Sequence, residues 1–286
     1  MVVGTVLLMA EQRSVGDADR EAKAAVGALF ESVAGVYDTV IDFFGRFGAG
    51  LVEAARLPPG ARVLDLACGR GAVLRPALAA VGARGSVLGI DLAPAMVHEL
   101  AGELAQRGVT NAEVRVGDAE HLDAPGASFD AATGGFMIFF PPDPPQVLRE
   151  IRRVLRPRGR IALSVFDGAA GFPFQSELQA SIGALAAPGP GSRFNEAAVL
   201  RASMADAGLL HVETVEMRER FHFVTVEEVE RWQRSTGVRR VLESLDDQQL
   251  ASYRAGLAER LEPFAADGGG FVLEQRAMAV VADAPG

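Results

Sequence analysis

The run from Val63 to Val73, VLDLACGRGAV, constrains the fold of this chain more than any other segment. Apolar residues on both sides of Asp65 predict a buried strand, Gly69 and Gly71 predict a tight loop, and a helical pattern begins near Val73. Such a loop lets the backbone approach a ligand closely at the amino terminus of the following helix. This order of elements opens a doubly wound α/β domain, which binds a nucleotide-like ligand at the carboxyl ends of its strands.

Strand and helix patterns alternate after this run, as expected for a parallel sheet with right-handed crossovers. The first strands are predicted at 62–66, 86–91, 112–116, 129–134 and 159–166. The helices between them are predicted at 73–81, 93–107 and 144–155. Further on we expect a helix at 195–207, a strand at 211–223 and a last strand at 276–281.

The same patterns divide the chain into four parts. Residues 1–60 are predicted to form a helical lid or extension of two or three helices, and residues 1–8 to be an upstream extension of the reading frame. The ligand-binding core is expected at 61–166, and a cap insertion at 167–195. The remainder of the core, 196–286, is expected to carry a helical insertion at about 226–264.

Charge and composition favour a small-molecule partner. The 286 residues carry a net charge of -9, which argues against a nucleic-acid surface. Lys23 is the only lysine, so Schiff-base and Walker-type phosphate chemistry are disfavoured. Cys68 is the only cysteine and the four histidines lack ligand spacing, so neither an intrachain disulfide nor a metal site is expected. No segment predicts a membrane span, and a cytoplasmic monomer or homodimer is expected.

The spacing within the loop bears on the class of ligand. A dinucleotide fingerprint has a third glycine where this chain has Leu74, although Asp91 lies at the right distance to hold ribose hydroxyls. The interpretation as an NAD(P)-dependent oxidoreductase is therefore weakened.

Five runs, in order, resemble the motifs of the class I S-adenosylmethionine-dependent methyltransferases. They cover about residues 60–166 and read VLDLACGRG, GIDLAPAMV, GDAEHL, SFDAATGGFMIFF and VLRPRGRIALSVF. Within that family, the sequences of these five runs are similar to those of the branch that contains the ubiquinone and menaquinone C-methyltransferases and many small-molecule enzymes of specialised metabolism. The resemblance implies a Rossmann-like, mostly parallel seven-stranded sheet with an antiparallel last strand, S-adenosylmethionine as cofactor, and a small organic methyl acceptor.

The resemblance also implies the cofactor residues. Asp65 and the backbone from Ala67 to Gly71 are expected to hold the methionine end, and Asp91 the ribose hydroxyls. The remaining residues are expected around the adenine and the sulfonium: Leu92, Met96, Asp118, Ala119, Glu120, Gly134, Gly135 and Phe136. A purely structural alternative for Asp65 and Asp91 is that their side chains cap the following helices. Cys68 is expected to be a small packed residue of the loop rather than a nucleophile.

The sequence says less about the residues that would bind the methyl acceptor or act as a base. A general base is needed only if the acceptor must lose a proton, and the candidates are His222, His121 and, less favoured, Asp143. For His222, solvent exposure or core packing is the more favoured interpretation, and His98 and His211 are expected at the surface. Candidate acceptor contacts lie outside the motifs and are Tyr37, Phe44, Phe139, Phe140 and Trp232. Three alternatives stay open: a cyclase or rearrangement enzyme that keeps the cofactor, the oxidoreductase, and a binding protein without activity.

Overall fold

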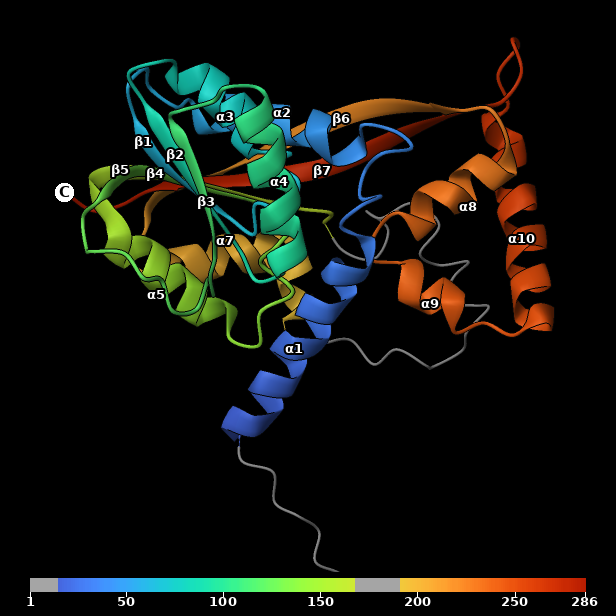
Figure 1. The fold of residues 1–286 in the computed structure, drawn as a ribbon, viewed down its shortest axis with the longest axis horizontal. Coiled ribbons are helices and arrows are strands. Elements are labelled where there is room, and N and C mark those ends of the chain that lie inside the picture. Colours follow the sequence, from blue (N-terminus) through green and yellow to red (C-terminus); the bar gives the residue numbers. More distant parts are fainter. Residues whose placement is uncertain (1–14, 168–190) are drawn as a thin grey trace, which may run out of the picture.

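The computed structural model describes residues 15–167 and 191–286, which form an α/β fold around one seven-stranded sheet (Figure 1). The strand order is β3-β2-β1-β4-β5-β7-β6. The strands are β1 Arg62–Leu66, β2 Ser86–Asp91, β3 Ala112–Val116, β4 Phe129–Gly135, β5 Leu155–Val165, β6 Leu210–Phe223 and β7 Phe271–Asp283. The first five are parallel to one another, whereas β7 runs antiparallel to both of its neighbours. The predicted fold class, including the antiparallel last strand, is confirmed.

The register brings the carboxyl ends of the central strands level with one another. Leu66 of β1 pairs with Ile90 of β2, and Asp91 pairs with Val116 of β3. On the other side of β1, Asp65 pairs with Thr133 of β4. Side chains and loops at these strand ends therefore face a common space, which is where open α/β sheets bind ligands.

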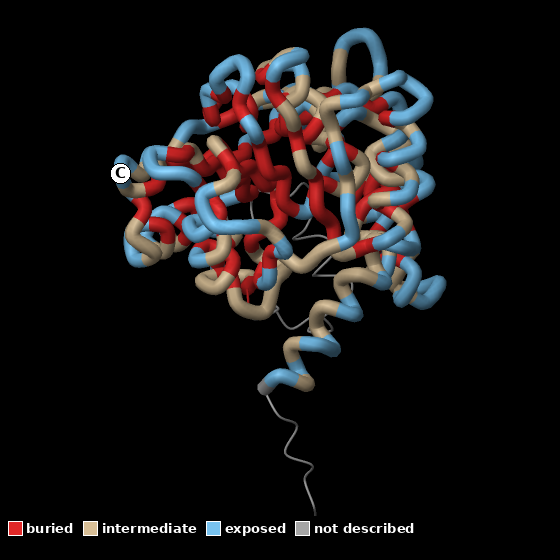
Figure 2. Tube along the Cα trace, turned by 60° about the vertical axis from the view of Figure 1, so that its left-hand side comes forward, coloured by how far each residue is buried: buried red, intermediate tan, exposed pale blue. Residues whose placement is uncertain are grey.

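Helices cover both faces of the sheet. One face packs against α2 Phe43–Ala55, α3 Leu74–Val81 and α4 Pro94–Gln106. The other packs against α5 Pro144–Val154 and α7 Ala197–Asp206, which follows the short 3-10 turn Ser192–Asn195. Figure 2 shows the buried strands in the interior with exposed loops around them. The central strands β1, β4 and β5 are thus mostly buried on both faces, as expected inside a parallel sheet, whereas the edge strand β3 is largely exposed.

Two further helical parts stand beside this core. Helix α1 Val15–Val33 precedes it, and the insertion between β6 and β7 consists of α8 Val226–Arg234, α9 Arg239–Glu243 and α10 Asp247–Leu261, followed by the 3-10 turn Glu262–Phe264. In Figure 1 the insertion lies at the outer end of the long β6 and β7 strands, and the end of α1 lies between it and the core. No helix in 15–167 or 191–286 has both the length and the apolar character needed to cross a membrane.

Most predicted boundaries agree with the structure to within one or two residues, and the starts of three elements are the ones to note. β7 begins at Phe271 rather than Arg276 because it pairs with β6 as far as Phe223. β5 begins at Leu155 rather than Gly159, since Leu155 already pairs with Phe129 before a register shift. The helix expected from Asn195 begins at Ala197. The prediction about residues 1–8, and most of the predicted cap at 167–195, fall outside the described residues.

Candidate functional site

A cavity of about 950 Å³ opens at the carboxyl ends of β1, β2 and β4. Its volume lies near the upper end of the range for small-molecule sites. The predicted cofactor residues that line it are Asp65, Ala67, Cys68, Gly69, Asp91, Leu92, Met96, Asp118, Ala119, Gly135 and Phe136. The predicted acceptor residues that line it are Tyr37, Phe44, Phe139 and Phe140. The structure thus brings the two predicted groups into one space.

The loop after β1 is held against β2 by its own backbone. Ala67, Gly69 and Gly71 all adopt positive φ angles, which fold the chain back tightly. The N–H of Cys68 donates to the carbonyl of Ile90 at 2.9 Å, and that of Gly69 donates to Oδ2 of Asp91 at 2.8 Å. The Cys68 thiol is buried, as expected for a packed residue. The loop is therefore preformed around Asp91.

Asp91 has backbone partners at both oxygens. Oδ1 accepts from the N–H of Ala93 at 2.9 Å, but Ala93 is itself the N-cap of α4 and the helix has no side-chain cap, so Asp91 does not cap the helix as the alternative interpretation expected. Burial raises the pKa of this carboxyl, and the backbone N–H groups of Ala93, Gly69 and Leu92 oppose that rise. A carboxylate oxygen accepts more than one hydrogen bond, so Asp91 can also receive hydroxyl donors from a ligand in the cavity.

Asp65 is the buried carboxylate with an unused oxygen. The Thr133 hydroxyl donates to Oδ1 at 2.9 Å, whereas Oδ2 is buried with no hydrogen-bond partner. Burial raises the pKa of Asp65 to about 7, and the negative charge of Asp91 adds to the rise. Hydrogen bonding to Thr133, and more weakly to the backbone N–H of Leu74 at the start of α3, opposes it. A buried acceptor without a donor is costly, and a cationic donor would remove that cost. This atom fits the amino group of a ligand's amino-acid end.

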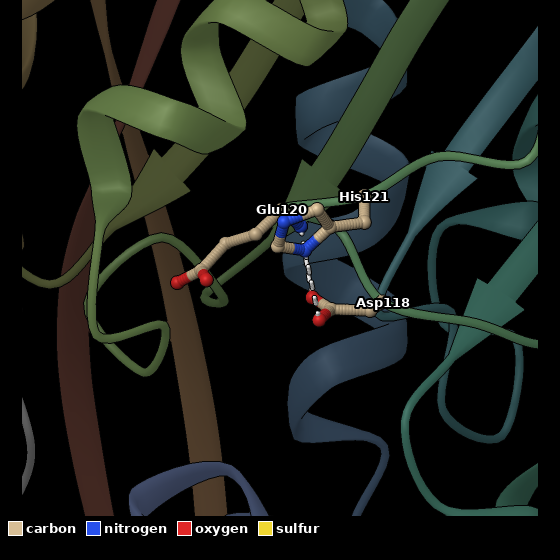
Figure 3. A group of neighbouring side chains, drawn as sticks. All are labelled: Asp118, Glu120 and His121. Atoms are coloured by element: carbon tan, nitrogen blue, oxygen red, sulfur yellow. Dashed lines mark hydrogen bonds and ion pairs between the residues drawn. The ribbon is translucent and has the colours of Figure 1, made fainter. Parts of the chain in front are cut away.

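The loop after β3 carries a small acidic cluster, Asp118 and Glu120 with His121 (Figure 3). One potential ligand atom from each of the three lies within 4.8 Å of the others. The ammonium of Lys23, on α1, lies 2.6 Å from Asp118 Oδ2 and 2.5 Å from Glu120 Oε2. Lys23 therefore supplies positive charge to the carboxylates here. Glu120 also accepts from the N–H of Asp143 and does not line the cavity.

Aromatic rings form much of the cavity wall. Tyr37 stacks on Phe44 with ring centres 5.2 Å apart, and Phe136 stacks on Phe166 at 4.1 Å. Phe30 meets Phe140 edge to face. A ligand with flat apolar surface can pack against such rings with favourable offset or edge contacts.

Trp232 and the predicted bases do not share this space. Trp232, on α8, is fully buried against Phe43 and Phe223 and does not line the cavity, so the structure places it in the core and gives no support to an acceptor contact. The His121 side chain is 72% exposed, with Nδ1 3.4 Å from Asp118. His222 is exposed on β6, near the carbonyl of Gly269. Their positions give no support to a base role for either histidine.

Three other predicted residues are not part of the cavity lining. Gly71 and Gly134 do not line the cavity, and a Cβ on Gly134 would meet the side chains of Leu163 and Met137. Asp143 accepts from the backbone N–H of Gln146 at the start of α5. It serves as the helix cap rather than facing the ligand space.

Sequence reasoning missed several cavity residues. Lys23, Gly27 and Phe30 follow helical spacing along α1, a signal that was present in the sequence. Gln233 and Phe166 also line the cavity, and nothing in their local sequence distinguishes them.

Comparison with known proteins agrees with this geometry. Residues 63–159 match the family model described as "Methyltransferase domain". The chain is 42% identical to nocamycin O-methyltransferase from Saccharothrix syringae over 137 residues, which are 48% of this chain and 49% of that protein. It is 39% identical to aklanonic acid methyltransferase DauC from Streptomyces sp. (strain C5) over 158 residues, 54% of this chain and 72% of that protein. The match thus spans about half the length of the first of these relatives.

A solved structure supports the fold. Phosphoethanolamine N-methyltransferase 2 from Haemonchus contortus, in complex with S-adenosyl-L-methionine, superposes with a TM-score of 0.58 at 15% identity. The superposition covers 90% of this chain and 57% of that one. At this identity the likeness concerns the fold alone.

Proposed function

This chain belongs to the class I S-adenosylmethionine-dependent methyltransferases, and from that premise we propose that it methylates a small organic acceptor of the natural-product or quinone type. The observation that carries the proposal is the buried, unpartnered Oδ2 of Asp65 beside the preformed loop that presents Asp91. Together they offer a site for an ammonium and for hydroxyl donors at one end of a single cavity.

The cofactor of the family is S-adenosylmethionine, and the residues present fit it. Asp65 and the Ala67–Gly71 backbone would hold its amino-acid end, and Asp91 its ribose hydroxyls. Leu92, Met96 and Ala119 offer apolar contact for the adenine. When bound, the cofactor supplies an electrophilic methyl group on a sulfonium.

The chain's own contribution is alignment and exclusion of water. Gly135 ends β4 next to the Asp65 strand, and Phe136, the residue after it, stacks on Phe166. These rings, with Tyr37 and Phe44, would fix a flat acceptor beside the cofactor and keep water away. Such positioning accounts for roughly 7–11 kcal/mol of barrier lowering in well-aligned reactions.

The relatives support the acceptor class. One is named for nocamycin and another for aklanonic acid, and the present cavity has room for an apolar molecule beside the cofactor. We infer a mid-sized acceptor with an aromatic or otherwise apolar body, because phenylalanine and valine side chains make up much of the cavity lining outside the cofactor loop.

The test is an unbiased screen of metabolite extracts for formation of S-adenosylhomocysteine. We expect product with a subset of apolar aromatic fractions, and none with an Asp91→Asn variant at low cofactor concentration. Acceptor consumption without S-adenosylhomocysteine would favour a rearrangement that retains the cofactor. Absence of S-adenosylmethionine binding in calorimetry would overturn the proposal.

A further inference from the structure

The helical insertion between β6 and β7 forms part of the cavity wall. Its lining residues come from the end of α8 through α9 and are Gln233, Thr236, Gly237, Val238 and Val241. This segment adjoins α1, because a Cβ on Gly237 would lie 3.7 Å from Leu29 and 3.9 Å from Phe30. The insertion and α1 therefore bound the same part of the cavity.

Gln233 is the buried amide of this wall. The residue is 1% exposed, and the Tyr253 hydroxyl on α10 donates to its Oε1. Its Nε2 is buried and has no hydrogen-bond partner. Tyr253 thus fixes the amide through its oxygen and leaves the nitrogen, a donor of two hydrogen bonds, unused.

The turn after α8 does not need this nitrogen. The Thr236 hydroxyl donates to the backbone carbonyl of Gln233 at 2.8 Å and accepts from the N–H of Val238 at 3.3 Å. Ser235 closes the same turn through the carbonyl of Trp232. Because backbone groups and hydroxyls complete the turn among themselves, the free Nε2 has no evident role in the local fold.

A buried donor without a partner is rare in a folded protein and destabilising, so each case calls for an explanation. Here the donor belongs to a cavity-lining residue in a largely apolar wall, which is how small-molecule sites place the few polar groups that orient a ligand.

We propose that Gln233 is a specificity-determining residue whose Nε2 donates a hydrogen bond to a carbonyl or phenolate oxygen of the acceptor, with Tyr253 as its positioning residue. This inference rests on the proposed function for the acceptor's role. With the Tyr253 hydroxyl donating to the amide oxygen, Nε2 is the group left to meet a ligand, so the matching ligand group is a hydrogen-bond acceptor. An acceptor would thus combine a flat apolar body with at least one such oxygen.

The test uses two probes that differ at one group, 2-acetylnaphthalene and 2-isopropylnaphthalene, the second lacking the carbonyl. Their dissociation constants are measured by equilibrium dialysis against the full chain saturated with S-adenosylhomocysteine. Gln233→Leu keeps the approximate volume and removes the donor. We expect it to reduce the preference for the ketone over the hydrocarbon about tenfold, the effect of one neutral hydrogen bond.

Two further variants separate this role from a structural one. Gln275→Leu changes a mostly buried glutamine on β7, whose Nε2 donates to the carbonyl of Arg276, and should leave the ketone preference unchanged. Tyr253→Phe frees the amide to rotate and should reduce the preference by a smaller factor. S-adenosylhomocysteine affinity should stay within twofold in all three variants.

An unchanged ketone preference in Gln233→Leu overturns the inference, as does an equal loss of affinity for both probes. If Gln233→Leu is too unstable to measure, the side-chain amide resonance of Gln233 in wild-type protein decides. It should move on addition of the ketone and not of the hydrocarbon. A failure of the proposed function can be told apart from a failure of this inference. The metabolite screen would then yield no S-adenosylhomocysteine, while the preference for the ketone over the hydrocarbon would persist.

Discussion

The Lys23 ammonium on α1 lies 2.6 Å from the carboxylate of Asp118, in the loop after β3. Two more contacts join α1 and the segment after it to the core. Glu31 accepts from the N–H of Ala95 at 2.7 Å, and the Arg70 guanidinium donates to the carbonyl of Ala34 at 2.5 Å. The helix is thereby fastened to two loops and one helix start that surround the cavity.

We expect Lys23→Met to loosen this helix and weaken S-adenosylhomocysteine binding about tenfold. The substitution leaves the Glu120 carboxylate, 5% exposed, without its cation, and the free energy of unfolding should fall by about 1–2 kcal/mol. Calorimetry and urea unfolding measure the two effects. Arg20→Met removes an exposed ion pair with Asp17 on the same helix and should change neither quantity. Equal behaviour of the two variants would contradict the role given to Lys23.

Asp91→Asn should weaken S-adenosylhomocysteine binding by roughly 10–100-fold, because charge-assisted hydrogen bonds to the ribose hydroxyls are lost. The asparagine oxygen can still accept from Gly69 or Ala93, so the loop should remain folded. Asp130→Asn is the matched control. It alters a carboxylate at the opposite end of β4, bonded to Arg62 and Arg156, and binding there should not change. Calorimetric titration of both variants distinguishes the two sites.

Cofactor affinity should depend on the protonation of Asp65. Burial raises its pKa from 3.8 to about 7, and a ligand ammonium favours the ionised form. Affinity for S-adenosylhomocysteine should therefore rise as the pH increases from 6 to 8. Asp65→Asn should bind more weakly and lose this dependence. A wild-type affinity that stays flat over this range would count against contact between Asp65 and the amino group.

The raised pKa of Asp65 has the opposite effect on the ligand-free protein, whose free energy of unfolding should fall as the pH rises. Between pH 3.8 and about 7 the folded chain keeps a proton on Asp65 that the unfolded chain has released. This contribution to the free energy of unfolding falls as the pH rises through that window and is level above it. Urea unfolding at several pH values should show a steeper fall in wild type than in Asp65→Asn. Asp38, whose pKa burial also raises to about 7, offers a second variant whose effect should be confined to stability.

Ala67→Gly should stabilise the protein slightly. Ala67 has a φ of 49°, a conformation that costs an L-residue roughly 1–2 kcal/mol and glycine almost nothing. The added freedom of glycine in the unfolded chain offsets part of this gain, so we expect about 0.5 kcal/mol. Thermal unfolding measures it, and cofactor affinity should stay the same. A loss of stability would mean that the methyl group makes contacts worth more than the strain.

Local patterns carried most of the information about the core. The bounds of β1, β2 and β3 follow from short strand patterns that stop before the glycine loop, at Asp91 and before Gly117, and the structure has them at the predicted residues. Trp232 was misplaced because helical spacing does not tell which side of an amphipathic helix faces a cavity and which faces the core. The pairing of Lys23 with Asp118 joins segments 95 residues apart, and no local pattern encodes such a contact.

The antiparallel pairing of β6 with β7 has an evolutionary consequence. The helices α8, α9 and α10 enter and leave through two adjacent strands, whereas the loops that present Asp65 and Asp91 belong to parallel strands elsewhere in the sheet. Insertions, deletions and recombination between β6 and β7 can therefore remodel one wall of the cavity without shifting the register of β1 and β2. Such changes can alter which methyl acceptor the protein binds, while the binding site for the methyl-donating cofactor stays the same.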